Sequence, residues 1–529
     1  MKYFYNIIKA DYLQRTRSYS FLITLVVTVY IAYLFVPLHT AKYTTLDVPG
    51  FKGAYNSAWA GYISGIMTTV MLSMYGFLLV NNSIKKDIET EVGLIIASTP
   101  ISNFSYLFSK QLSNFLVLLT ITGCTFLVSI IMFFVRGTDY PFVFSAFLYP
   151  YLIFAVPAMS LVASMAVVAE VFLDRKSILQ FIVYFFIFGF TMASIKIQGA
   201  DSLITLLDPF GLKVITNSIT NAINSQFHTH INDTSFGFIF RGKQDFQVFV
   251  FEGVNWQLPF LLSRIVWIGI SLALVYFSSF FFHRFDFKQS VSKKNNKPVQ
   301  LTADLVSDEK EMISPVGISR ALLPPLVFDY SIFPFVKTEL LLMIRKGNQL
   351  LWLVNAGLWI AMFFVSLPIA HSYLLPVLLF LQVIRWSDLT TKEKTNRLHY
   401  FSYAAYRPLF RILPAQILSG IIVAMVMALP VIVRYAIISD LFAVVNIING
   451  SVLIILLAVC LGIITEGKKL YEIIFFMLTY SAVNKLPITD YLGGAPHDNH
   501  LVYISVLPGL NIILVLVSFI VRNYQSRHI

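Results

Sequence analysis

Charged residues are scarce in this chain. Asp, Glu, Lys and Arg make up 12% of its 529 residues, and hydrophobic residues make up 57%. Soluble domains usually carry about 25% charged residues, so this composition excludes an ordinary soluble protein and indicates an integral membrane protein. Cysteine is nearly absent as well: Cys124 and Cys460 fall in separate apolar segments. They indicate neither a disulfide nor a metal site, and we interpret them as small core residues.

A phosphate-binding loop of the G-x-x-x-x-G-K-[ST] type is also missing, which excludes ATP hydrolysis by the usual route. The formal net charge of +12 does not indicate nucleic-acid binding. If the N-terminus is cytoplasmic, most of the 39 lysines and arginines fall in cytoplasmic segments, and the 27 acids do not share this bias. This positive-inside pattern predicts a multi-pass protein of a bacterial cell membrane with both termini in the cytoplasm. We expect no cleaved signal peptide.

Roughly 20 apolar residues are needed to cross a membrane as a helix. Twelve such stretches can be read, of which the eighth and eleventh are the weakest: 19–36, 57–80, 112–135, 144–172, 178–198, 257–283, 350–367, 369–386, 412–433, 441–464, 470–487 and 501–521. They predict an all-α protein of two parallel six-span halves, since each half has an even number of spans. The first half is 1–283, with an external insertion at about 199–256. A polar cytoplasmic linker, 284–336, precedes the second half, 337–529.

One segment pattern occurs before both halves. A basic residue, an acid two positions later and an arginine six positions further on precede an apolar stretch in each case. The residues are Lys9, Asp11 and Arg17 in the first half, and Lys337, Glu339 and Arg345 in the second. The first segment, 2–17, is too polar to span, but its apolar residues cluster on roughly one side of a helix. We therefore expect an interfacial helix before each half, with basic side chains near anionic head groups.

The loop after the second stretch is expected to project into the cytoplasm. Thr99 suits a helix cap and Pro100 the first helical position, and the pattern then continues to Val135. Such a helix would be about 54 Å long, so 88–104 would protrude from the membrane. Its candidate contact residues are Glu91, Gly93, Leu94, Ile95, Ile96, Thr99 and Pro100. The alternative is that its apolar residues fold back on the protein itself.

The second half has a related segment at 392–408, with Tyr403, Tyr406 and Arg407 as candidate contact residues. An offset of 305 residues places Gln111 on Gln416. The chain resembles the transmembrane subunits of ABC transporters, specifically the ABC-2 exporter-type permeases. The resemblance depends on the interfacial segment, on Glu91-Val-Gly93 followed by Ala97-Ser-Thr-Pro100, and on Lys110-Gln-Leu-Ser. The resemblance implies that 88–104 and 392–408 are coupling helices for separate ATP-binding subunits, two per chain. It implies no catalytic residue and no cofactor.

Two other classes are weighed against this resemblance. A secondary transporter of the major facilitator type would carry a Gly-x-x-x-Asp-Arg-x-Gly-Arg motif between spans two and three, where 81–111 has a single glycine. Its ion-coupling residues are also missing, since the ionisable residues in spans (Glu170, Arg264, Glu472) lie near span ends. A membrane-embedded transferase would use Asp201, Asp208 and Asp245, and a metal site would use His228, His230 and Asp233. The sequence favours neither, and it does not indicate the substrate.

Overall fold

A computed structural model of the chain gives the fold. It describes residues 2–37, 41, 43–136, 140–173, 177–195, 208–229, 234–240, 246–282, 331–346, 349–396, 398–404, 406–483, 490–494 and 500–527. The predicted linker 284–336 therefore lies outside the described residues as far as residue 330.

Long apolar helices dominate the described residues. Seven of them are long and apolar enough to cross a membrane: Ser57–Glu89, Asn103–Arg136, Phe144–Leu173, Leu258–Phe281, Pro408–Ile437, Leu441–Thr465 and Ser505–Arg527. A bent pair, Phe4–Thr16 with Phe21–Leu34, turns by 69° at its break and could form an eighth span. A multi-pass helical membrane protein is thus confirmed, whereas the count of twelve spans stays a prediction.

The first helical bundle is centred on α6 (Asn103–Arg136), which makes its largest contacts with five other helices. These are α1 (Lys2–Thr16), α2 (Tyr19–Leu34), α3 (Ser57–Val80), α8 (Val156–Leu173) and α12 (Leu258–Phe281). The helix α7 (Phe144–Pro150) continues through a π-helical turn, η1 (Tyr151–Ala155), into α8. Pro150 and Pro157 lack the backbone N–H that a regular α-helix needs there, which accounts for this irregular turn. The helix α9 (Ser177–Ile195) packs on α8 and α3.

The second bundle repeats this packing around α20 (Pro408–Ile437). Its neighbours are α13 (Phe333–Arg345), α14 (Gln349–Phe364), α16 (Leu375–Phe380), α21 (Leu441–Thr465) and α23 (His500–Arg527). Short pieces complete it: α15 (Leu367–Ile369), η4 (Ala370–Leu374), α17 (Val383–Trp386) and α22 (Lys469–Val483). In chain order, the contacts of α20 with α13, α14, α16, α21 and α23 therefore correspond to those of α6 with α1, α2, α3, α8 and α12.

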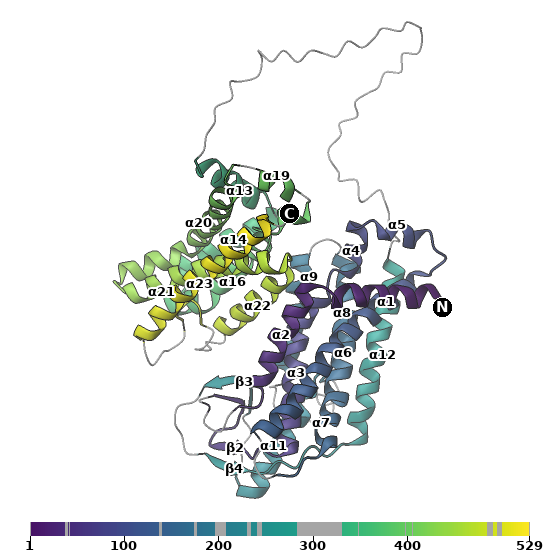
Figure 1. Cartoon of the computed structure of the whole chain (residues 1–529). Helices are drawn as coiled ribbons and strands as arrows, with labels where there is room; N and C mark the ends of the chain where they lie inside the picture. The colour runs from purple at the N-terminus through teal and green to yellow at the C-terminus, as the bar shows by residue number, and fades with distance from the viewer. Residues whose placement is uncertain are drawn as a thin grey trace, which may run out of the picture.

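The two bundles, purple to teal and green to yellow in Figure 1, are in contact with each other. The helix α22 packs against α2 and α3 of the first bundle. Aromatic rings fill the contact: the ring centre of Phe181 lies 5.3 Å from that of Phe380 and 4.8 Å from that of Phe476. This buried aromatic surface joins the two bundles.

Strands at one end of the first bundle were not expected from the sequence, which predicts an all-α protein. β1 (Tyr43–Asp47) pairs antiparallel with β3 (Ser235–Phe240), and β2 (Phe51–Gly53) pairs parallel with β4 (Gln247–Phe249). The insertion thus folds against the loop after α2, at the end of the bundle opposite α5 (Figure 1). These strands are short and their partners lie nearly 200 residues away in the sequence. The only sequence pattern that indicates them is a local alternation of aromatic residues.

An Asp-initiated turn occurs late in each bundle, before α11 (Leu212–Phe227) in the first and before α23 in the second. Asp208 accepts hydrogen bonds from the backbone N–H groups of Phe210 (2.9 Å) and Lys213 (2.8 Å). Asp490 does the same for Leu492 (3.1 Å) and Gly493 (2.9 Å). A glycine with positive φ stands three residues after each Asp, Gly211 at 81° and Gly493 at 79°, where a side chain would be strained. In the first bundle the helix α11 follows directly after Gly211.

Candidate functional site: two projections and the ion pairs beneath them

The helix α4 (Ser83–Glu89) follows α3 and leads into the first projection, residues 88–104, which contains the short helix α5 (Val92–Ala97). Each begins at a residue in the left-handed conformation, Asn82 (φ 68°) and Glu91 (φ 60°). This conformation is uncommon for residues other than glycine. The helices α3 and α4 nevertheless run on as one segment, Ser57–Glu89, and α5 lies at the same end of the bundle as α1 (Figure 1).

The apolar residues of the first projection divide into two sets. Ile96 and Ile101 are buried and pack in a cluster with Ile84 and Tyr106, so the alternative of folding back on the protein holds for these two. Leu94 and Ile95 are 40% and 68% exposed. Val92 and the acid Glu91 are exposed beside them, and Gly93 is buried. An apolar tip with an acid next to it therefore remains on the surface.

The expected start of the third span at Thr99 and Pro100 is wrong. The helix α6 begins at Asn103, and Thr99 donates its hydroxyl to the carbonyl of Ile96, 2.6 Å away. The hydroxyl oxygen of Ser102 instead accepts a hydrogen bond from the N–H of Ser105 at 3.1 Å. Ser102 thus caps the helix. Thr99 is already used to close the end of α5, which leaves Pro100 in the connecting turn.

Beneath the first projection lies a group of buried ionic residues, Asp11, Asp87, Tyr106 and Lys110, which we call the first ion cluster. The ammonium of Lys110, only 1% exposed, is 2.7 Å from a carboxylate oxygen of Asp11 and 2.6 Å from one of Asp87. The hydroxyl of Tyr106 donates to the same oxygen of Asp87 at 2.7 Å. One lysine on α6 therefore joins the interfacial helix α1 to the base of the projection.

A second anchor of the first projection is Glu170 on α8. Its carboxylate accepts hydrogen bonds from the backbone N–H groups of Ser83 (2.7 Å), Ile84 (2.8 Å) and Lys85 (3.1 Å), and from the Ser83 hydroxyl. A carboxylate is favourable at the N-terminus of a helix, where N–H groups lack partners and the helix dipole is positive. Glu170 therefore fixes α4 to α8 and needs no ion-coupling role to account for its burial.

The second projection, residues 392–408, contains two short helices, α18 (Lys392–Thr395) and α19 (His399–Ala404). Exposed apolar side chains are again found at its tip: Leu398 (52%), Tyr400 (63%) and Phe401 (78%). Of the predicted contact residues, Tyr403 faces inward, with the Arg522 guanidinium 4.9 Å from its ring centre. Tyr406 and Arg407 are exposed just before α20. The second tip is therefore aromatic where the first is aliphatic.

The second ion cluster consists of Glu339, Lys392, Glu393, Gln416 and Arg522. Lys392 forms an ion pair with Glu339 of the interfacial helix α13. Glu393 pairs with Arg522 of α23 and accepts a 2.9 Å hydrogen bond from the Gln416 amide on α20. Burial raises the pKa of Glu339, and the nearby Lys392 partly offsets this rise. The cluster joins α13, α18, α20 and α23.

The two ion clusters make the same connection between helix and loop, although the aligned loop positions carry opposite charges. The offset of 305 residues that aligns Gln111 with Gln416 also aligns Asp87 with Lys392. In the first bundle the acid of the interfacial helix reaches the loop through Lys110 on the long helix. In the second bundle the loop supplies the lysine itself. In both, the interfacial helix and the projection are held together by a lysine.

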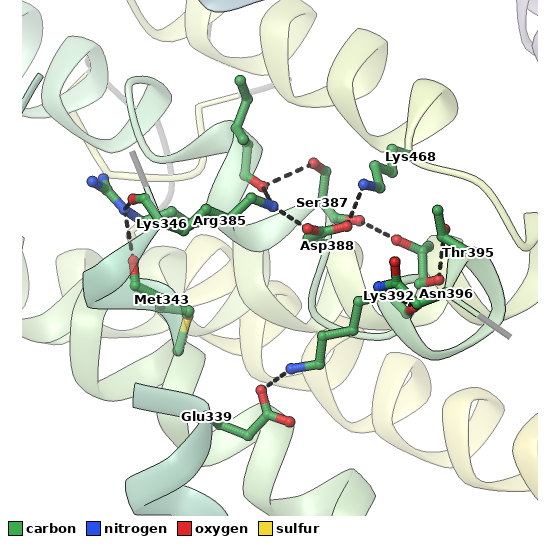
Figure 2. A network of polar contacts seen from close by, with 12 residues as sticks. Glu339, Met343, Lys346, Arg385, Ser387, Asp388, Lys392, Thr395, Asn396 and Lys468 are labelled. Atoms are coloured by element: carbon green, nitrogen blue, oxygen red, sulfur yellow. Dashed lines mark hydrogen bonds and ion pairs between the residues drawn. The ribbon is translucent and has the colours of Figure 1, made fainter. Parts of the chain in front are cut away.

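Asp388 joins a third set of ionic residues at the base of the second projection (Figure 2). Its carboxylate pairs with Lys346, at the end of α13, and with Lys468, just before α22. Lys346 also donates to the carbonyl of Ile384 at 3.0 Å. The pKa of Asp388 is lowered: burial acts to raise it, but the two lysines together outweigh burial.

Lys469, the residue after Lys468, contacts the first bundle. Lys469 donates to the carbonyl of Leu78 at 3.0 Å, and Arg15 of α1 donates to the carbonyl of Val80 at 3.2 Å. Both carbonyls belong to the last turn of α3, where backbone acceptors lack helical partners and cations are favourable. Lys468 and Lys469 therefore connect the bases of the two projections, one through Asp388 and one through α3.

The predicted interfacial segments are helices, and their ionic residues point in two directions. Asp11 and Glu339 face the bundles and enter the two ion clusters. Their basic companions are exposed: Lys9, Arg17, Lys337 and Arg345. The acid of the repeated pattern thus makes the contact with the bundle. The flanking cations are exposed, where they can contact lipid head groups or solvent.

No group of three metal-ligating side chains occurs among the described residues. His228 is exposed, whereas His230, Asp233, Asp201 and Asp245 lie outside the described residues, and Asp208 is used in its turn. No protein-family model and no curated protein matches this chain in sequence.

Proposed function

We propose that this chain is the membrane-spanning permease of an ATP-driven exporter of the ABC type, built as two parallel six-span halves. The neighbour contacts of α6 recur around α20, which supports two related halves. The seven long helices, the bent pair, three shorter apolar helices (Leu179–Met192, Leu351–Phe364, Leu367–Phe380) and α22 would together make the twelve spans. The substrate remains open.

The observation that carries the proposal is the repeated unit at one end of each bundle. Each unit has an interfacial helix, a lysine-centred ion cluster and a two-helix loop whose tip exposes large apolar residues. Exposed apolar residues on a polar loop are typical of a surface that another protein covers. The ion clusters would pass a force on the tip to the long helices α6 and α20, because buried ion pairs resist separation.

A separate subunit would have to supply the energy. Two segments come close to a phosphate loop, Gly237 to Gln244 and Gly462 to Lys469, but each has Gln or Lys where Ser or Thr must bind magnesium. Gly237 lies inside the strand β3 and Gly462 inside the helix α21, whereas the first glycine of such a loop follows a strand. ATP binding would draw two ATPase subunits together and tilt the bundles through the projections.

Charge placed on a projection tip tests this docking. Ile95→Asp and, separately, Phe401→Asp should lower co-purification of the ATP-binding subunit encoded beside this chain. An unpaired charge buried at the contact costs about 2–5 kcal/mol. Ile438→Asp is the matched control, because Ile438 is 65% exposed at the opposite end of α20. It should leave co-purification unchanged.

Normal co-purification of both variants at normal abundance would show that the tips are not the docking sites. Transport that continues after deletion of the ATPase would instead favour an ion-coupled secondary transporter. A product that depends on Asp208 or another external acid would favour a membrane transferase.

A further inference from the structure

The contact between the two bundles is made by aromatic side chains from three helices. Phe181 and Phe185 belong to α9, Phe380 ends α16 and Phe476 belongs to α22. The ring centre of Phe476 lies 4.8 Å from that of Phe181 and 5.5 Å from that of Phe185. It lies 5.7 Å from that of Phe380. We call these four rings the aromatic contact, and Phe476, which is only 3% exposed, is enclosed by rings of both bundles.

The aromatic contact lies close to the end of the bundles that carries the projections. Phe181 is four residues after Ser177, the first residue of α9, and Phe476 is seven residues after Lys469, the first residue of α22. At 1.5 Å per residue, these positions are about 6 and 10 Å from the starts of their helices. Lys469 itself donates to the last turn of α3, at the base of the first projection. Since half of the hydrocarbon core is about 15 Å thick, the aromatic contact joins the bundles in the half of the membrane nearest the projections.

The helix α9 borders both the aromatic contact and the outside of the bundle. Phe181 is buried, whereas Leu179, Val183 and Phe186 are exposed on another side of the same helix. Exposed apolar side chains of a membrane-spanning helix lie against acyl chains, which are as apolar as they are. Phe185 is half-buried between these two sides, and its ring packs on that of Phe476. Phe185 therefore stands at the edge of the aromatic contact, between its buried rings and the lipid-facing side of α9.

A movement of one bundle against the other would uncover the aromatic contact. Ile473 and Met477, on the same helix as Phe476, also pack against the core of the first bundle. Opening such a surface to water is unfavourable, because apolar side chains then lose the hydrophobic stabilisation of burial. Opening it to acyl chains is far less unfavourable, because lipid tails are as apolar as these side chains. The residues of the contact therefore favour an apolar molecule between the parted bundles.

We propose that the cargo of this exporter passes through the aromatic contact, entering from the bilayer beside α9, and that it is a lipid-like molecule with acyl or isoprenoid chains. This inference rests on the proposed function, because it takes the two bundles as the halves that move. Transporter binding sites commonly lie where two repeats meet, which is the position of the aromatic contact. A polar cargo such as an oligosaccharide would need hydrogen-bonding partners, which aromatic rings do not supply.

The reactivity of a cysteine in the aromatic contact during ATP turnover tests this passage. Phe181→Cys is made in the full chain with Cys124 and Cys460 replaced by alanine, and its complex with the ATP-binding subunit is reconstituted in liposomes. N-pyrenylmaleimide, which dissolves in the bilayer, should label the introduced thiol about 5-fold faster with ATP than without nucleotide, as for an open state that rises from about 10% of the molecules to about half. A sulfonated, membrane-impermeant maleimide should label it equally slowly in both conditions.

The matched control is Phe186→Cys, which lies on the same helix and replaces a side chain that is 69% exposed on its lipid-facing side. N-pyrenylmaleimide should label it at the same rate with and without ATP. A phosphatidylethanolamine with a photoactivatable diazirine on its acyl chain gives a second readout on the unsubstituted chain. Each residue of α22 is buried or half-buried, so cross-links to α22 should increase several-fold during ATP turnover. A disulfide between Phe181→Cys and Phe476→Cys should prevent this increase.

Three outcomes would overturn the lipid passage. Faster labelling by the sulfonated maleimide with ATP would show an aqueous passage and a polar cargo. Unchanged labelling and cross-linking in a complex that hydrolyses ATP would show that cargo does not pass through the aromatic contact. A chain that binds no ATPase would instead remove the proposed function, so ATP hydrolysis distinguishes the two failures. Phe185→Cys, at the half-buried edge of the contact, repeats the labelling test if Phe181→Cys does not fold.

Discussion

Single lysines join the helices α1 and α13 to the bases of the two projections. Lys110 is almost fully buried and lies within 2.7 Å of two carboxylates, so its ammonium pairs with both Asp11 and Asp87 in the first ion cluster. A buried ion pair adds little over a well-packed apolar contact, but removing one partner leaves an uncompensated charge behind. Lys110 and Lys392 are therefore the residues whose loss should matter most for the projections.

Lys110→Met should lower the free energy of unfolding in detergent by about 3–5 kcal/mol, since two buried acids then lose their cation. The control is Lys9→Met on the neighbouring interfacial helix. Lys9 is exposed, and its substitution should stay within about 0.5 kcal/mol of the wild type. Denaturant titrations of the two variants provide the comparison, and equal stability of both would show that the first ion cluster is not structural.

Asp388 provides a pH-dependent test at the same scale. Its pKa in the folded protein is lowered by Lys346 and Lys468 in spite of burial. An acid with a lowered pKa contributes stability above its unfolded pKa of about 3.9, and this contribution is lost as pH falls through the folded value. Asp388→Asn should therefore be less stable than the wild type at neutral pH, by on the order of 1 kcal/mol for a partly exposed pair.

That difference should shrink as the pH falls below about 4. Thermal unfolding of both proteins at neutral and acid pH measures it. A difference that stays constant across this range would show that the ion pairs of Asp388 do not stabilise the fold.

At the scale of elements, sequence patterns predicted the long helices well. The apolar stretch at 57–80 coincides with α3, and 441–464 ends one residue before α21 does. A long apolar helix depends mainly on residues that are close in the sequence, so it can be predicted without knowledge of the fold. The strands β1 and β3 could not be read, because their stability comes from a distant partner.

The candidate site was predicted in part, for a similar reason. The location of both projections and the residues of both interfacial helices follow from a repeated local pattern. The inward direction of Ile96, the capping role of Glu170 and the partners of Lys110 depend on helices that meet only in the folded chain. The offset of 305 residues aligns Asp87 with Lys392 in the sequence. Because the two residues have opposite charges, the sequence does not indicate that both join a projection to a helix.

The helix α22 packs against the first bundle, and the contribution of Lys469 at its start can be tested directly. Lys469→Met removes a charged hydrogen bond to α3 worth about 1.5–3 kcal/mol. A disulfide between cysteines introduced at Phe181 and Phe476, with Cys124 and Cys460 replaced by alanine, reports contact between the bundles. Its yield should fall in Lys469→Met.

Lys468→Met is the matched control for this element. Lys468 pairs with Asp388 inside the second bundle, so its loss should leave the disulfide yield between the bundles unchanged. An equal fall in both variants would show that α22 is loosened as a whole, and that Lys469 has no separate role between the bundles.

At the scale of the whole molecule, the two bundles are alike in packing and unlike at their tips. The first tip is aliphatic with an acid beside it, whereas the second is aromatic. A pair of docking sites that differ in this way should bind two ATPase subunits with different strength, or bind two different ATPases. One chain should nevertheless provide both halves of a complete transport pathway.

The mass of the intact complex tests this central claim most directly. The chain, co-expressed with the ATP-binding subunit encoded beside it and purified in mild detergent, is analysed by native mass spectrometry. We predict one copy of this 60.0 kDa chain with two ATPase subunits. Two copies of this chain with two ATPases would show that the second bundle is not a working half, and the absence of any bound ATPase would contradict the permease assignment itself.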